Sequence, residues 1–252
     1  LRQALTVTAQ PADRADLLER LGLALVPAGR YTDAVTALGE ARESRVALGD
    51  RTAAGRITRT LGDCLISAKL MDDARQVLEE GVEQYADLPD ESIVLGLKGQ
   101  LARCYLLIDH DREAVRISDE VLERAEHGGH LAILADTLVT KGTALGYQGR
   151  TLEGTALVEL GARVADEQAL VVTRFRALNN QLVLMGDVDP LRAYQATLEG
   201  ISLARKVGSV QWVRNFAGNF GYMAYRVGEW DVAERELRAV LEEEIEPGDA
   251  AL

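Results

Sequence analysis

The sequence predicts an all-α protein in which six antiparallel helix pairs stack into a solenoid. Three observations lead to this prediction. Ala, Leu, Glu and Arg dominate the 252 residues while proline occurs only five times, a composition that favours helices. A pair of residues, most often leucine followed by glycine or alanine, recurs about every 40 residues. In five of the six units a second small residue follows this mark twelve positions later, where a second helix would cross the first.

The two marks define six units. The first mark occurs at Leu21-Gly22, Leu61-Gly62, Leu101-Ala102, Lys141-Gly142, Leu178-Asn179 and Phe220-Gly221. The second mark occurs at Ala34, Ala74, Ala114, Gly154 and Ala233. In the fifth unit Leu191 holds the second position and Ala193 follows two residues later, so we expect a longer turn between the two helices of that unit.

Each unit has the pattern of two helices. In the first unit the residues that share one helical face are Leu18, Leu21, Gly22 and Leu25, and those of the second helix are Ala34, Leu38 and Ala41. Pro27-Ala28-Gly29 separates the two helices. Glycine or alanine at the crossing lets the two backbones approach closely. Asp50, Asp90 and Ser209 are predicted N-caps of later first helices, and 72–85 and 231–244 are predicted second helices.

These marks resemble the tetratricopeptide repeat family in its longer form of about 40 residues per unit, over about residues 12–245. The resemblance implies a right-handed superhelix whose first helices line a concave groove. Lys98 and Lys141 stand where the family usually has apolar residues, and Asn179 replaces a small one. A lysine can lay its stem along an apolar surface and keep its head in water, so each departure weakens one unit only.

The chain is predicted to be a single solenoid with repeats at 12–50, 51–89, 90–130, 131–168, 169–208 and 209–246. Residues 1–10 have the pattern of a trailing second helix, and 246–252 that of a loop leading into a further unit. Because solenoids normally end in polar capping helices, we expect a fragment of a larger bacterial protein whose uncapped ends fray or self-associate. The excess of arginine over lysine, 24 to 4, is typical of GC-rich bacterial coding.

Composition and motifs argue against several functions. A net charge of −12 disfavours nucleic acid as a partner of this segment, and no apolar run is long enough for a membrane span. The sequence has no phosphate-binding loop, zinc-protease motif, nucleophile elbow or dinucleotide fingerprint, so we expect no enzyme, cofactor or catalytic residues. We read 126–130, with two histidines, as a solvated loop in preference to a metal site, and His110 as a turn residue. Cys64 and Cys104, equivalent in consecutive units, are predicted packing residues in a reducing cytoplasm.

Helix geometry identifies the surface that would bind a partner. Residues six and three before each small residue, and one after it, point away from the core face. These positions are Asp16, Glu19, Leu23, Arg56, Arg59, Asp63, Arg103 beside two glycines, Asp136, Val139, Thr143, Thr173, Arg176, Asn180, Asn215, Gly218 and Tyr222. The predicted peptide-binding groove comprises Arg56, Arg59, Arg103, Arg176, Asn180, Asn215, Asn219 and Tyr222. Guanidinium groups hold carboxylates in two-point contacts, which favours an acidic or carboxylate-terminated partner.

One arrangement within the groove is sharper. Family members that grip a terminal carboxylate use a basic residue, an asparagine one turn later and an asparagine in the next unit. Arg176, Asn180 and Asn219 resemble that trio by position, with arginine in place of the usual lysine. The alternative is that they are ordinary polar groove residues, some of which bridge neighbouring units. Tyr222 and Tyr225 would either form an aromatic wall or pack against a further unit.

Two functions remain open from the sequence. The first is a non-catalytic scaffold that binds a protein or peptide in its concave groove. The second is a sensory or autoinhibitory arm of a multidomain signalling regulator, because long repeats of this kind resemble those of LuxR-type activators and some nucleotide cyclases. Such an arm would respond to a small ligand or to another part of the same polypeptide. The complete reading frame would distinguish the two.

Overall fold

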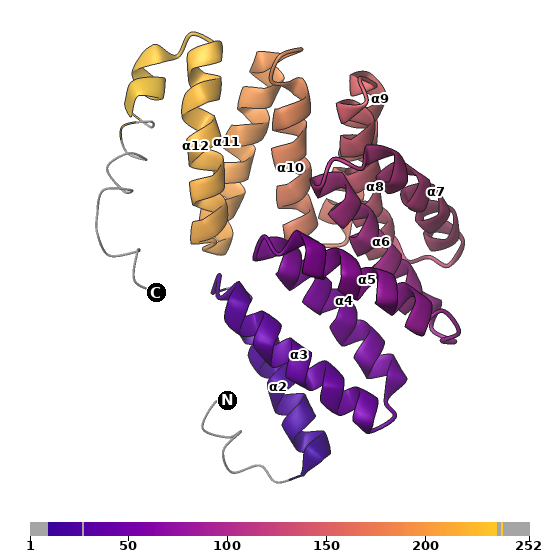
Figure 1. The fold of residues 1–252 in the computed structure, drawn as a ribbon. Coiled ribbons are helices and arrows are strands. Elements are labelled where there is room, and N and C mark those ends of the chain that lie inside the picture. The colour runs from indigo at the N-terminus through magenta and orange to yellow at the C-terminus, as the bar shows by residue number, and fades with distance from the viewer. Residues whose placement is uncertain (1–9, 27, 236–237, 239–252) are drawn as a thin grey trace.

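The structure is a computed structural model that describes residues 10–26, 28–235 and 238, and within them it is an all-α solenoid (Figure 1). The helices are α2 (Pro11–Leu25), α3 (Tyr31–Ala47), α4 (Arg51–Ser67), α5 (Met71–Gln84), α6 (Glu91–Leu107), α7 (Asp111–His127), α8 (Leu131–Tyr147), α9 (Thr151–Glu167), α10 (Val171–Met185), α11 (Pro190–Val207) and α12 (Val210–Arg226). Residues 230–235 are helical as well. The predictions for residues 1–9, most of 231–244 and the end of the chain fall outside the described residues.

Successive helices pack as antiparallel neighbours, and among the first helices α4 also packs against α6, α6 against α8 and α8 against α10. The stack curls strongly (Figure 1). The hydroxyl of Tyr31, at the start of α3, donates a hydrogen bond of 2.6 Å to Oε1 of Gln211, at the start of α12. Two parts of the chain 180 residues apart therefore meet. The even-numbered helices lie on the inner side of this curl and bound a concave surface.

The small residues of the two sequence marks lie where two helices approach most closely. A Cβ atom at Gly142 of α8 would lie 2.5 Å from the carbonyl oxygen of Gly154 of α9, and one at Gly154 would lie 2.3 Å from that of Gly142. Both distances are too short for any side chain, because the obstacle is backbone. The two glycines that the 40-residue pattern marks are therefore required by the crossing of α8 and α9.

The turns between helices share one geometry. Residues 29, 49, 129, 149, 208 and 228 are glycines with positive φ, and Lys69, Asp109 and Ala169 adopt positive φ at equivalent places. The left-handed conformation ends a helix and turns the chain back, and glycine adopts it without strain. A nearly 20-residue period of turns underlies the 40-residue unit.

The predicted details of the helix ends agree with the structure. Asp50, Asp90 and Ser209 each cap a helix, accepting hydrogen bonds from the backbone N–H groups of residues 53, 92 and 212. In the fifth unit Ala193 is buried while Leu191 is exposed, and four residues separate α10 from α11. Ala193 therefore takes the crossing position there, after the longer turn that the sequence predicts.

The core runs along the stack between the helices. From α2 to α7 it is one continuous cluster of aliphatic side chains that includes both cysteines. Cys64 and Cys104 are free and buried, as predicted, and burial raises the pKa of their thiols to about 12 and about 11. Toward the C-terminal end the core contains aromatic side chains, with the rings of Phe175 and Trp212 stacked at 5.0 Å between centroids.

The two lysines that interrupt the repeat pattern have largely buried side chains, and both charged heads form ion pairs with partly exposed carboxylates of α7. Nζ of Lys98 contacts Glu120, and Nζ of Lys141 lies 2.6 Å from Oδ1 of Asp119. These lysines thus join neighbouring first helices to one second helix. No described helix is both long enough and apolar enough to cross a membrane.

Candidate functional site

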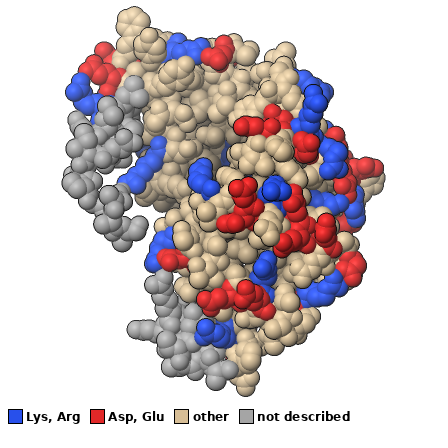
Figure 2. Space-filling model, in the orientation of Figure 1, with Lys and Arg blue, Asp and Glu red and all other residues tan. Residues whose placement is uncertain are grey.

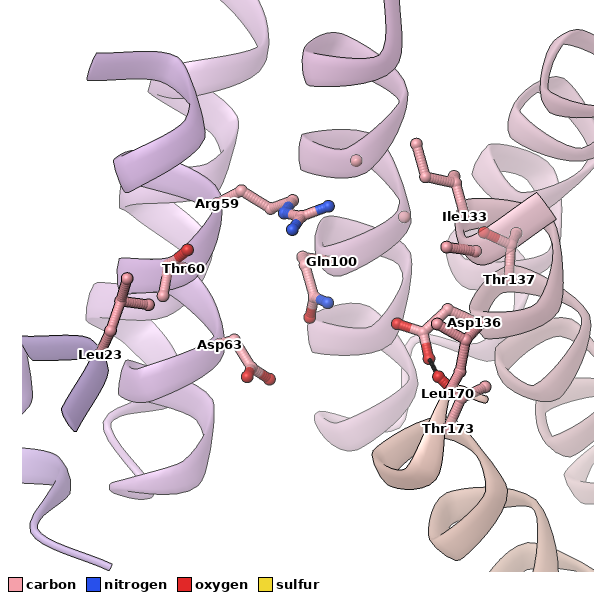
Figure 3. A pocket seen from close by; sticks show the side chains of 13 residues that line it. Leu23, Arg59, Thr60, Asp63, Gln100, Ile133, Asp136, Thr137, Leu170 and Thr173 are labelled. Carbon is pink, nitrogen blue, oxygen red and sulfur yellow. Dashed lines mark hydrogen bonds between the residues drawn. The ribbon is translucent and has the colours of Figure 1, made fainter. Parts of the chain in front are cut away.

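A pocket of about 340 Å³ opens on the concave surface (Figure 3). Its walls come from successive first helices, α2, α4, α6, α8 and α10, and from the residue before α10. The residues that line it are Leu23, Arg59, Thr60, Asp63, Gly96, Gly99, Gln100, Ala132, Ile133, Asp136, Thr137, Leu170 and Thr173. The pocket is therefore assembled by the stacking of units and by no single helix.

Helix geometry placed several of these residues correctly on the groove side. Leu23, Arg59, Asp63, Asp136 and Thr173 belong to the predicted positions, and Gly96 and Gly99 are the two glycines beside Arg103. The sequence reasoning missed Thr60, Gln100 and Thr137 among the polar ones. Thr60 and Gln100 stand two residues before the small residue of their units, the same offset as Asn219. Testing that offset in every unit would have found them.

Two ion pairs between neighbouring first helices form a row of alternating charge beside the pocket. Nη1 of Arg103 on α6 donates to Oδ1 of Asp63 on α4. Nη1 of Arg176 on α10 donates to Oδ1 of Asp136 on α8 over 2.6 Å. Each pair joins residues 40 apart in the sequence. The row therefore ties the units together and neutralises two of the four arginines that were expected to make the groove cationic.

Asp136 is the most strongly held of these charged groups. Its Oδ1 also accepts a hydrogen bond of 2.9 Å from the hydroxyl of Thr173. Burial raises the pKa of Asp136, but Arg176, Arg103 and the Thr173 hydroxyl lower it more, so that the pKa lies below its ordinary value of 3.8. Burial lowers the pKa of Arg176 below its ordinary value, against the opposing attraction of Asp136. A guanidinium remains protonated at neutral pH, so the pair is charged on both sides.

The trio proposed as a carboxylate grip has internal partners. Only 8% of the Arg176 side chain is exposed, and its Nη2 donates to Oγ1 of Thr140 over 2.9 Å. Asn180 donates to Oγ1 of Thr143 over 2.8 Å, and Asn219 donates to the carbonyl oxygen of Asn215 over 3.2 Å. The hydrogen bonds of Arg176 and Asn180 cross between α10 and α8. Arg176 and Asn180 are therefore polar groove residues that bridge neighbouring units, which is the alternative that the sequence left open.

The predicted groove residues on α12 lie near the end of the described stack. Asn215 is exposed and donates to Oδ1 of Asn179 on α10 over 3.1 Å. Tyr222 is also exposed, and its hydroxyl accepts a hydrogen bond of 3.0 Å from Nη1 of Arg226. The same Nη1 donates to Oδ1 of Asp187 over 2.8 Å. None of these residues lines the pocket.

Arg56 and Arg59 differ from the other two groove arginines. Both are exposed on α4, and neither has an ion pair or hydrogen bond from its side chain within the described part of the chain. Arg59 lines the pocket, whereas Arg56 does not. The side chain of Arg59 lies over Gly96 of α6, where an added Cβ would come within 2.7 Å of its Cδ (Figure 3). Glycine at 96 therefore leaves the room that this arginine uses.

His110 and His127 each contact a neighbouring residue of the same chain segment. His110 stacks on Tyr105 with ring centroids 5.8 Å apart, and Nδ1 of His127 lies 2.7 Å from the carbonyl oxygen of Glu123. Within the described residues, no group of three or more His, Cys, Asp or Glu side chains could hold a metal ion.

Charge is unevenly distributed over the face shown in Figure 2. Acidic and basic side chains intermix over α3, α5 and α7, whereas few charged side chains appear over α10 and α12. Ion pairs within single units include Arg51 with Asp87 at 2.6 Å and Arg124 with Glu91 at 2.5 Å. On this face, charged side chains of both signs are therefore concentrated over α3, α5 and α7.

The fold and the groove define a tetratricopeptide-repeat-like α-solenoid, and solved structures of this kind are similar to it. One is a Rap protein complexed with competence and sporulation factor (11% identity, TM-score 0.69, covering 90% of this chain and 74% of that one). Another is aspartyl phosphate phosphatase F from Bacillus subtilis (12%, 0.63, covering 97% and 73%). A third is a signal-transduction ATPase with numerous domains and a tetratricopeptide repeat sensor, from Pyrococcus horikoshii (12%, 0.61, covering 94% and 37%). At these identities the likeness shows the fold alone.

No family model and no curated protein matches the sequence itself. The three solved structures therefore share the fold with only 11–12% of residues identical.

Proposed function

We propose that this chain is a non-catalytic scaffold that binds a protein or peptide partner along its concave surface. The observation that carries the proposal is the pocket of about 340 Å³ to which five successive first helices contribute, with polar side chains on each of α4, α6, α8 and α10. A segment lying along this surface would contact several units at once. Binding energy would then come from the stack as a whole.

The chemistry of the surface favours an acidic or carboxylate-terminated partner. Arg56 and Arg59 present guanidinium groups without partners among the described residues, and each can hold a carboxylate in a two-point contact. Asn215 and Gln100 offer side-chain amides, which can meet both the N–H and the C=O of an extended backbone. The ion-paired Arg103 and Arg176 would shape the surface and leave the partner to the free arginines.

The absence of catalysis is part of the proposal. One similar structure carries the name of a phosphatase. The titratable residues that line the pocket here are Arg59, Asp63 and Asp136, and both carboxylates are bonded to arginines. Such pairing holds both carboxylates against arginines, which suits positioning better than proton transfer.

A bulky side chain in the groove tests the proposal. Gly218 on α12 is exposed on the predicted groove side, and no atom lies within 4 Å of a Cβ added there. A synthetic library of 12-residue peptides, with free and with amidated C-termini, would be screened by fluorescence anisotropy against the parent chain. We expect bound peptides to be rich in Asp and Glu or to require a free C-terminus. Gly218→Trp should weaken them at least tenfold.

The matched control is Leu152→Trp on α9, where the exposed side chain lies on an outer helix. It adds the same indole group outside the groove and should leave binding unchanged. Equal affinity of the selected peptides for the parent chain and for Gly218→Trp would contradict the proposal, provided that circular dichroism shows both to be folded.

A second candidate function is the sensory or autoinhibitory arm of a multidomain signalling regulator. It is favoured by the likeness to a signal-transduction ATPase that is described as having a tetratricopeptide repeat sensor, of which the match covers 37%. The complete reading frame would test it. Nucleotide-binding motifs next to a helix-turn-helix or cyclase domain would support it, and a reading frame that encodes repeats alone would exclude it.

A further inference from the structure

In the pocket, Arg59 and Asp63 remain apart although their spacing in the sequence would let their opposite charges pair. Arg59 and Asp63 stand four residues apart on α4, a spacing at which opposite charges usually attract. They form no ion pair, because Asp63 is bonded to Arg103 while Arg59 extends over Gly96. Figure 3 shows the Arg59 guanidinium at one end of the pocket, with Asp63 and Asp136 at the other and Gln100 between them. The pocket therefore has a basic end and an acidic end.

The acidic end retains capacity to accept hydrogen bonds. Asp63 and Asp136 each bind their arginine through Oδ1, and the hydroxyl of Thr173 also donates to Oδ1 of Asp136. The Oδ2 atom of each carboxylate has no hydrogen bond within the described chain. Since a carboxylate can accept about four hydrogen bonds, both aspartates could still receive a donor from the pocket.

Two unpartnered polar atoms lie in the walls between the two ends. Thr137 is only 1% exposed, lines the pocket, and its Oγ1 has no hydrogen-bond partner in the described part of the protein. Its hydroxyl faces α6, where a Cβ at Gly99 would lie 3.3 Å away (Figure 3). Oε1 of Gln100 is likewise buried and unpartnered. A buried polar atom without a partner is destabilising, so two in one pocket point to a polar ligand.

We propose that the pocket binds a small zwitterion, a free amino acid or a short peptide with both ends unblocked. Its carboxylate lies against the guanidinium of Arg59, and its ammonium donates to Oδ2 of Asp63 and of Asp136. Gln100 accepts a backbone or ammonium N–H after a rotation of its terminal amide, a torsion with a broad energy minimum. The hydroxyl of Thr137 donates to a ligand oxygen.

Size and charge agree with this ligand. The volume of about 340 Å³ lies near the lower end of the ~300–1,000 Å³ of small-molecule sites. The pocket therefore holds a few residues at most. The ion pairs Asp63–Arg103 and Asp136–Arg176 are each neutral, so Arg59 alone gives the site its net positive charge. A bound zwitterion would leave this net charge unchanged. Leu23, Ile133 and Leu170 would contact an apolar side chain of the ligand.

Blocking the two ends of the ligand separately tests the inference. Isothermal titration of the full chain would use alanine and a random tripeptide library in four forms: unblocked, N-acetylated, C-amidated and blocked at both ends. We expect the unblocked form to bind and either block to weaken binding at least tenfold. Binding of alanine alone would identify an amino-acid site, and binding of the tripeptides alone a peptide site.

Substitutions test which residue contacts the carboxylate of the ligand and which contacts its ammonium group. Arg59→Gln should remove the preference for a free carboxylate, and Asp63→Asn should remove the preference for a free ammonium. Arg163→Gln, on an exposed arginine of α9, is the matched control and should bind like the parent. Equal binding of all four ligand forms, or binding of none, would overturn the inference. So would an equal loss in Arg163→Gln.

The inference rests on the proposed function only in requiring an accessible groove, and the two can fail separately. Long blocked peptides that bind the parent chain and are lost in Gly218→Trp, without any binding of unblocked tripeptides, would support the groove and overturn the pocket ligand. Tripeptide binding that depends on Arg59, with no effect of Gly218→Trp on any longer peptide, would support the pocket ligand and overturn the groove.

Discussion

Arg59 and Arg176 occupy the same position of the repeat, three residues before the small residue of their units, yet their surroundings are opposite. Arg176 is buried between α10 and α8 and is bonded to Asp136 and Thr140. Arg59 is exposed and has no hydrogen-bonded partner in the described chain. Its side chain occupies the space above Gly96. One arginine holds the stack together, and the other is available to a ligand.

The difference arises from which carboxylate is within reach. Asp136 stands six residues before the small residue of the preceding unit, and the residue equivalent to it for Arg59 is Asp16. Asp16 is instead bonded to Arg45, whose side chain is mostly buried and also approaches Glu19 and Asp50. Repeat position thus determines the direction of a side chain, while competition among neighbours determines its partner.

The largest effect should come from breaking the buried pair. Arg176→Ala should lower the free energy of unfolding by about 3 kcal/mol, because removal of one partner leaves Asp136 largely desolvated without its counter-charge. Urea denaturation followed by circular dichroism measures it. Arg176→Ala combined with Asp136→Ala should cost less than the sum of the two single changes, since the orphaned charge is then gone. Equal costs for Arg176→Ala and Arg59→Ala would remove the distinction drawn above.

A pH titration should detect the ion pair between Asp136 and Arg176 through the pKa of Asp136. The pKa of Asp136 is lowered in the folded chain, so its ionisation adds stability that is fully present above the unfolded value near 3.8. That stability is lost as the pH falls through the lower folded pKa. NMR titration of the Asp136 carboxyl carbon should give a midpoint below 3.8. The stability difference between the parent and Asp136→Asn should shrink over the same range; a midpoint at or above 3.8 would contradict the pairing.

An intermediate effect is expected for the pair at the edge of the pocket. The side chains of Arg103 and Asp63 are 19% and 38% exposed, between the buried pair and a surface pair. Arg103→Ala should therefore lower the free energy of unfolding by about 1 kcal/mol, the upper range of measured exposed pairs. Raising the salt concentration should reduce this cost more than that of Arg176→Ala, because water screens the more exposed pair better. Urea denaturation at low and high salt measures both.

Much of the fold could be predicted because backbone geometry leaves a regular trace in the sequence. The approach of Gly142 to Gly154 excludes every side chain, and the left-handed turns favour glycine at 29, 49, 129, 149, 208 and 228. The groove side of each first helix also followed from the 100° rotation per residue. The partners of the groove arginines could not be predicted, because a guanidinium on a long side chain reaches carboxylates on several helices. Thr137 could not be predicted, because what distinguishes it is a buried hydroxyl without a hydrogen-bond partner among the described residues, which a sequence does not reveal.

The smallest effect on stability should come from the free arginine. Arg59 has no ion pair within the part of the chain that the structure describes, so Arg59→Ala should change the free energy of unfolding by less than about 0.5 kcal/mol, the usual range for surface positions. Its Coulombic attraction helps to lower the pKa of Asp136, so the same change should raise that pKa slightly in the NMR titration. If Arg59→Ala is as stable as the parent and the pKa of Asp136 rises, Arg59 acts on Asp136 through its charge and does not contribute to the ion pairs that stabilise the stack. A loss of stability like that of Arg103→Ala would mean that Arg59 is held by the fold and is not free for a ligand.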